Sequence, residues 1–226
     1  MRKTIFNWLG REFISLSGEA RKEINPAEEI QELLQSFEAE LKSMSLSFDN
    51  TVRTRLWGRD SDSRRLGSAQ RGKVFTGRAR SSSSSFFEPN YFDSQAHVAL
   101  DLLAIRPSGA GIEKLLREYD PPVAPLRFLI YDSIVFLSGV TAIGPSLDDQ
   151  VSKIITAISN SLFEAKSSWD KVVKTSFFLH SSQDYNELRE HFQKKVKVTI
   201  PQTEYLFVNG YAGEGNLLEI EVTART

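Results

Sequence analysis

Two stretches of the sequence, Phe13-Ile14-Ser15-Leu16-Ser17-Gly18 and Ile134-Val135-Phe136-Leu137-Ser138-Gly139, repeat one pattern at an offset of 121 residues. Each is an apolar run that ends in Ser-Gly, which predicts a buried strand followed by a tight turn, since Gly permits positive φ. At the same offset, residues 30–41 and 151–162 both carry apolar side chains at helical spacing. The pattern therefore predicts a strand and an amphipathic helix, present twice.

Two further pairs of segments extend the repeat. Residues 48–54 (FDNTVRT) match residues 169–175 (WDKVVKT), where an aromatic-Asp turn leads into a β-branched strand. Residues 98–104 match residues 218–224 at an offset of 120. Four matched elements in one order indicate a duplication. We therefore expect two tandem domains, 1–115 and 120–226, joined through the proline-containing stretch 109–125.

The two halves differ between these matched elements. Residues 183–196 predict a second helix, whereas their counterpart, residues 60–77, is rich in Gly, Ser and Arg and is expected to be partly loop. The serine run 81–85 is either a flexible loop or, as the repeat suggests, a strand entered at Arg80. Residues 210–215 (GYAGEG) lie between two strand-like runs, so a hairpin turn is favoured over a phosphate loop.

Composition excludes several functions. The 226 residues include 15 Phe, carry a formal net charge of -1 and contain no Cys, so disulfides and cysteine nucleophiles are absent. Three scattered His residues show no metal-ligand spacing, and no metal site is expected. The sequence has no apolar run suited to a signal peptide or a membrane span, and a cytoplasmic location is expected.

The order of these motifs resembles the RidA/YjgF (reactive intermediate deaminase) family, closely over residues 125–226 and more weakly over 5–106. The resemblance implies an α/β (α+β) fold in each domain, with helices on one face of a mixed sheet. It also implies trimers with ligand clefts between neighbouring domains. The expected chemistry is hydrolysis of imines and enamines at a small carboxylated molecule, with no metal or organic cofactor.

The residues of the family site are divided between the halves. Arg80, in Arg78-Ala79-Arg80-Ser81, matches the family arginine that binds the substrate carboxylate, and Glu219 matches the acid that positions water. The second half has Pro201-Gln202-Thr203 where the arginine is expected, and the first has Ala99 in place of the acid. The Ser-Gly motifs supply polar contacts to the ligand in the family. The resulting candidates for ligand contact are Ser17, Gly18, Arg80, Ser81, Ser138 and Gly139, with Arg80 and Glu219 as catalytic residues.

Each candidate also has a simpler interpretation. Arg80 could be a surface residue of a basic loop, and Glu219 a solvated carboxylate on an edge strand. The basic stretch 53–80 could attract an anion into a cleft, form a salt-bridged surface, or bind RNA with Trp57, Phe75 and Phe86 stacking on bases.

Three hypotheses for function follow. The first is a diverged Rid-type enzyme that hydrolyses an imine or enamine, or performs a related water addition, elimination or cyclisation, on a small anionic molecule. The second is a binding module that has lost catalysis, and RNA binding or cleavage ranks last.

A homo-oligomer is expected, as a trimer of two-domain chains, because two domains cannot close a ring of three. No membrane partner is expected, and a nucleic acid is disfavoured by the near-zero net charge.

Overall fold

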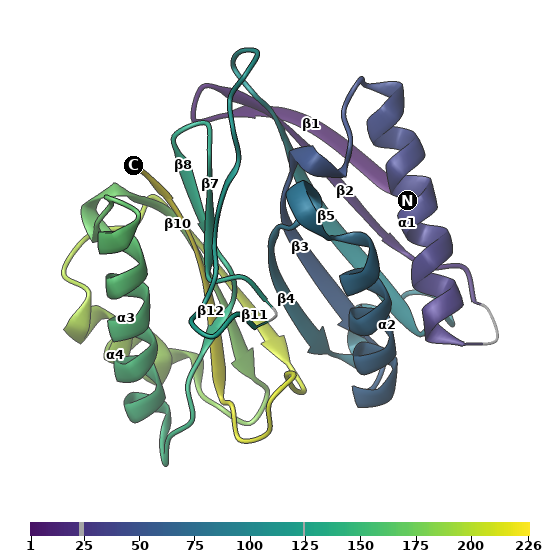
Figure 1. The fold of residues 1–226 in the computed structure, drawn as a ribbon. Helices are drawn as coiled ribbons and strands as arrows, with labels where there is room; N and C mark the ends of the chain where they lie inside the picture. The colour runs from purple at the N-terminus through teal and green to yellow at the C-terminus, as the bar shows by residue number, and fades with distance from the viewer. Residues whose placement is uncertain (23–24, 124) are drawn as a thin grey trace.

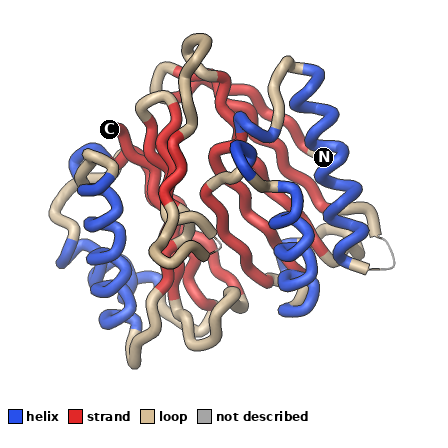
Figure 2. Tube along the Cα trace, in the orientation of Figure 1, coloured by secondary structure: helices blue, strands red, loops and turns tan. Residues whose placement is uncertain are grey.

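The computed structural model describes residues 1–22, 25–123 and 125–226, so residue 124 of the expected junction lies outside the described residues. Two β-sheets lie face to face in the centre of the molecule, and each carries a pair of helices on its outer face (Figure 1). The same arrangement appears in Figure 2, where the helices flank the strands on both sides.

The first sheet has the strand order β1-β2-β5-β3-β4. Its elements in chain order are β1 (Arg2–Trp8), β2 (Arg11–Glu19), α1 (Pro26–Ser43), η1 (Phe48–Asn50), β3 (Thr51–Gly58), α2 (Ser61–Val74), η2 (Gly77–Ala79), β4 (Ser82–Phe87), η3 (Pro89–Tyr91) and β5 (Val98–Arg106).

The second sheet repeats this order as β7-β8-β12-β10-β11, with β6 added at the β7 edge and β9 paired with β12. Its elements are β6 (Leu115–Arg117), β7 (Phe128–Tyr131), β8 (Ile134–Leu137), β9 (Val140–Thr141), α3 (Leu147–Glu164), η4 (Trp169–Lys171), β10 (Val172–His180), α4 (Tyr185–Lys195), β11 (Gln202–Val208) and β12 (Leu218–Arg225).

The register of the strands also repeats. Arg53 pairs with Leu103 across a bulge in the first sheet, and Lys174 pairs with Thr223 across a bulge in the second. In each sheet one parallel strand pair, β3–β4 or β10–β11, joins otherwise antiparallel neighbours. The predicted fold class, a mixed sheet with helices on one face in two tandem domains, is confirmed. The exact residue bounds of the two domains stay a prediction.

The long helices form for the reasons that the sequence suggested. Asn25 caps α1 by accepting hydrogen bonds from the backbone N–H groups of Ala27 and Glu28, and Ser146 caps α3 through the N–H of Asp149. Their apolar faces pack on the sheets and build one core beneath each helix pair.

The expectation that residues 60–77 are partly loop is wrong for most of that stretch, because α2 covers Ser61–Val74. Asp60 caps it by accepting a hydrogen bond from the N–H of Ser63. Its buried residues are Ser63, Arg64, Gly67 and Arg71, which have helical spacing but are not apolar. Hydrophobic periodicity therefore could not reveal this helix.

The expectation of a hairpin turn at residues 210–215 is also wrong. β11 and β12 do not pair, because β10 lies between them. The segment is a crossover loop, and its start is joined to the first domain: the N–H of Phe87 donates to the carbonyl of Gly210 over 3.1 Å.

The facing sheets are held together by two apolar clusters that combine residues of both domains. One contains Phe13, Ile105, Leu129 and Phe136, and the other contains Trp57, Phe86, Ala99, Phe178 and Tyr211. Burial of these side chains removes apolar area from water and is the main driving force for the association of the two sheets.

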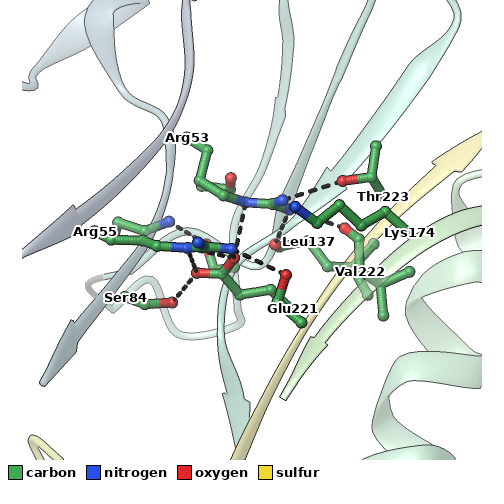
Figure 3. A network of polar contacts seen from close by, with 12 residues as sticks. Arg53, Arg55, Ser84, Leu137, Lys174, Glu221, Val222 and Thr223 are labelled. Atoms are coloured by element: carbon green, nitrogen blue, oxygen red, sulfur yellow. Dashed lines mark hydrogen bonds and ion pairs between the residues drawn. The ribbon is translucent and has the colours of Figure 1, made fainter. Parts of the chain in front are cut away.

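A charged cluster lies at the centre of the same interface (Figure 3). Glu221 of β12 is 1% exposed and accepts hydrogen bonds from the guanidinium of Arg55 at 2.8 and 3.0 Å and from Ser84 Oγ at 2.7 Å. Arg53 forms an ion pair with the same carboxylate at 3.3 Å and donates to the carbonyls of Leu137 and Val222. Glu221 of the second domain thus pairs with two arginines of the first, and Glu204 supplies a second carboxylate to Arg55 at 3.2 Å.

We predict that Glu221→Gln destabilises the protein by roughly 3–5 kcal/mol, because it leaves buried Arg53 without its carboxylate partner. The measurement is the free energy of unfolding in urea at neutral pH. Glu204→Gln is the matched control, since Glu204 pairs with Arg55 but its side chain is 35% exposed, and we expect a loss of about 1 kcal/mol or less. Equal losses for the two variants would contradict this account of the interface.

Candidate functional site

A cavity of about 490 Å³ opens between the two domains. The first domain contributes one face of α2, the segment around Arg80 and the serines of β4. The second contributes Gly139, Thr141, Glu219 and the crossover loop at Tyr211, Ala212, Gly213 and Asn216. Neither domain forms this cavity by itself.

Glu219 is the only carboxylate among the residues that line the cavity in the described part of the chain. It points from β12 to the same side as Glu221, two residues along the strand, and is 6% exposed. Burial raises the pKa of Glu219 to about 8, and the neighbouring charge of Glu221 adds to this, against the opposing effects of Ser84, Arg71 and Arg55. At neutral pH this side chain is therefore mostly a carboxylic acid that can donate a proton.

Gly139 permits the position of Glu219. A Cβ atom built on Gly139 would lie 1.6 Å from Oε1 of Glu219, so any other residue here would displace the carboxyl group. Sequence reasoning expected positive φ at this glycine, but it is not among the residues with positive φ. The reason for glycine at this position is the close approach of the carboxyl group to the backbone.

The serine of the same motif ties the second domain to β4. Ser138 Oγ accepts a hydrogen bond from the N–H of Ser83 over 3.1 Å, and the N–H of Gly139 donates to the carbonyl of Ser83 over 3.3 Å. Ser138 is 1% exposed, so it stands behind the cavity wall and holds it in place.

Arg80 lies at the C-terminal end of η2 and lines the same cavity. Its Nη1 donates to a carboxylate oxygen of Glu118, which comes from the segment that connects the domains, and both side chains are 30% exposed. The arginine is therefore already paired, but only one of its nitrogens is used in this pair.

The structure brings four of the predicted site residues together: Arg80, Ser81, Gly139 and Glu219 all line the cavity. Ser17 and Gly18 do not, because they lie within β2, where a Cβ on Gly18 would meet Met1 and Leu33. The arginine of the first domain and the acid of the second thus line one interdomain cavity.

Comparison with known proteins shows similarity to one family over the second half of the chain. Residues 124–226 match the family model described as endoribonuclease L-PSP. The second half of the chain is similar to this family. The resemblance to RidA/YjgF proteins is thereby confirmed.

One solved structure has the same fold over nearly the whole chain, and others are similar to about half of it. A chorismatase structure covers 99% of this chain and 79% of its own, with 13% identity and a TM-score of 0.69. Rv2704 from Mycobacterium tuberculosis, a YjgF/YER057c/UK114 family member, covers 50% of this chain and 100% of its own, with 21% identity and a TM-score of 0.45. An endoribonuclease L-PSP homologue from Entamoeba histolytica has 24% identity, 50% and 94% coverage and a TM-score of 0.44. No curated protein matches the sequence.

The sequence did not predict the residues of α2 and of the crossover loop that line this cavity. Arg64, Ser68 and Arg71 line the cavity from one face of α2, and Tyr211 and Asn216 line it from the loop. One sequence pattern could have indicated this helix face: Arg64 and Arg71 are seven residues apart, with Gly67 between them. That spacing places all three on one side of a helix.

The aromatic residues considered for RNA stacking are not available for it. Trp57 and Phe86 are 1% and 0% exposed in the cluster between the sheets, and Phe75 is 9% exposed. Within the basic stretch around them, Arg53, Arg64 and Arg71 are buried, whereas Arg65, Lys73 and Arg78 are exposed. The buried arginines contribute to the interdomain interface and the cavity.

Among the described residues, no group of three or more His, Asp or Glu side chains is placed to hold a metal ion. None of the helices in the described part of the chain has the length and apolar character needed to cross a bilayer.

We predict that Gly139→Ala displaces the carboxyl group of Glu219 and lowers its pKa toward the ordinary value. In the wild type, the free energy of unfolding should fall as the pH rises from about 4.5 to about 8, because the unfolded chain loses this proton first. That dependence should shrink in the variant, as measured by urea unfolding across this range. Gly18→Ala, in the equivalent motif, is the control and should keep the full dependence. An unchanged pH dependence in Gly139→Ala would show that residue 139 does not contact the carboxyl group of Glu219.

Proposed function

We propose that this protein is an enzyme that adds water to a small unsaturated carboxylate in the interdomain cavity, with Glu219 as the proton donor. The observation that carries the proposal is a buried carboxylic acid, neutral near pH 7, facing a cavity lined with arginines. Arg80 offers the unused part of its guanidinium to the substrate carboxylate, and Ser81 and Gly139 line the reacting region.

For an enamine substrate the atoms balance as follows. Glu219 gives its proton to the terminal carbon of the C=C bond, which leaves an iminium at the carbon next to the carboxylate. Water attacks this carbon, forms a C–O bond and returns a proton to Glu219. The C–N bond then breaks, ammonia leaves with the hydroxyl proton, and a 2-keto acid remains. An imine substrate enters at the second step, with Glu219 ionised to accept the proton from water.

A binding module without catalysis is the alternative hypothesis, because each half has lost part of the family site. The shared cavity weakens that argument, since the retained arginine and acid lie in the same cleft. The full-chain structural neighbour is named as an enzyme, a chorismatase, which also supports a catalytic function for two domains in this arrangement.

We predict accelerated release of 2-keto acid from 2-aminoacrylate or 2-imino acids generated in the assay. For the enamine 2-aminoacrylate, kcat/KM should fall as the pH rises through about 8, because the acid form of Glu219 that protonates the carbon is lost. Glu219→Gln should reduce the rate by about 100-fold or more. Arg80→Lys keeps the charge but loses the planar fork, and should weaken substrate binding by about 1.5–3 kcal/mol.

Glu214→Gln is the matched control, because Glu214 lies in the same crossover loop and is exposed. Its rate should equal that of the wild type. Lack of acceleration with every substrate, or full activity in Glu219→Gln, would reject the proposed reaction and favour the binding module.

We further propose that the chain self-associates as a trimer of two-domain chains. Equivalent positions of the two domains contact each other, Arg55 with Ser176 and Arg11 with Asp132, as occurs along an axis of rotational symmetry. The edge strand β1 exposes Ile5 and Phe6. Light scattering at tens of micromolar protein should give the mass of three chains, and a strict monomer would contradict this proposal.

A further inference from the structure

Arg64 is a buried cation without an anion. The residue is 8% exposed on the cavity face of α2, and its Nε makes no hydrogen bond. No ion pair of this side chain is present among the described residues. Its pKa is lowered by burial and by the nearby charge of Arg65, with no carboxylate raising it.

Arg71 is two helical turns further along the same face and is 7% exposed. Its guanidinium donates to the carbonyl of Ser84 over 2.8 Å and approaches the hydroxyls of Thr54 and Ser68 at 3.5 and 3.4 Å, all of which are neutral. Burial lowers the pKa of Arg71 to about 10, although Glu219 and Glu221 oppose the shift. Arg71 therefore stays charged at neutral pH.

The charges around the cavity do not balance. Arg80 is paired with Glu118, Arg53 is paired with Glu221, and Arg55 is paired with both Glu221 and Glu204. Glu219, the single acid of the described cavity wall, is mostly neutral at pH 7. Arg64 and Arg71 remain as two uncompensated cations, which is costly for buried groups unless an anion binds there.

We propose that Arg64 and Arg71 form an anion subsite on α2, so that the ligand carries two separated anionic groups. One group lies between these arginines and the other lies at Arg80, with the reacting atoms near Glu219 between them. The inference rests on the proposed function for the position of the reaction, but the subsite itself requires only binding. A second carboxylate or a phosphate has the shared chemistry that two guanidinium groups recognise.

A structural function for Arg64 makes the opposite prediction for stability. A side chain that stabilised the fold would make hydrogen bonds or ion pairs, and Arg64→Gln would then lower the melting temperature. Because Arg64 is an uncompensated cation, we expect Arg64→Gln to keep or raise the melting temperature of the ligand-free protein. The wild type, in turn, should be stabilised by a dianion.

The test measures binding of benzoate, isophthalate and 3-phosphonobenzoate by calorimetry at pH 7, on the full chain. These probes share one ring and differ in their second group. We expect isophthalate to bind the wild type at least tenfold more tightly than benzoate, the effect of one charged hydrogen-bonded contact. In Arg64→Gln this advantage of isophthalate over benzoate should disappear. A preference for 3-phosphonobenzoate over isophthalate would identify the second group as a phosphate.

Arg65→Gln is the matched control, because Arg65 is the next residue of α2, has a side chain that is 62% exposed and forms an ion pair with Asp62. It should keep the full preference for the dianion. Equal binding of benzoate and isophthalate by the wild type, or an unchanged preference in Arg64→Gln, would overturn the subsite. If the subsite is overturned in this way but turnover still depends on Glu219, the proposed reaction is still supported. Dianion binding that depends on Arg64, without turnover, would instead reject the reaction alone.

Discussion

The contact of Glu221 with Arg53 and Arg55 fixes how the two domains meet. The carboxylate belongs to the central strand of the second sheet and the guanidinium groups to β3 of the first, so the ion cluster sets the position of β12 against β3. Apolar contacts alone tolerate sliding, whereas a buried charge keeps its stability only with its partners in place. The position of Glu219, two residues along β12, is therefore set by the same contact. The cavity depends on this register.

Glu219 and Glu221 lie on one face of β12 but differ in charge at neutral pH: Glu219 is mostly neutral and Glu221 is ionised. Glu221 is surrounded by two guanidinium groups and Ser84, which hold its pKa below the ordinary value despite its burial. Glu219 is almost as deeply buried but makes no ion pair with an arginine among the described residues, and burial therefore dominates and raises its pKa. The ionised group maintains the interface, and its negative charge helps keep the neighbouring acid protonated. The ion cluster that holds the domains together therefore also affects the protonation of Glu219, two residues along the strand.

The sequence was sufficient for the fold because the evidence for it was repeated. The strand ending in Ser-Gly, the amphipathic helix at residues 151–162 and the final strand each appeared twice in one order, and the structure confirms the tandem mixed sheets. The sequence was insufficient where the buried residues of an element are polar or charged. The face of α2 consists of Arg64, Gly67 and Arg71, so apolar periodicity has no signal there. The loop at residues 210–215 was misassigned because local sequence does not show that β10 separates β11 from β12.

The division of the arginine and the acid between the halves follows from what each position packs against. Ala99 stands where the second domain has Glu219: it pairs with Trp57, as Glu219 pairs with Phe178, and is 1% exposed. It belongs to the apolar cluster between the sheets, where a carboxylate would be buried without a partner. In a ring of identical domains every domain must supply both groups to its neighbours. A fused pair forms one internal cleft, so an acid at position 99 is not needed for that cleft, and an apolar residue there strengthens the interface that holds Glu219 in place.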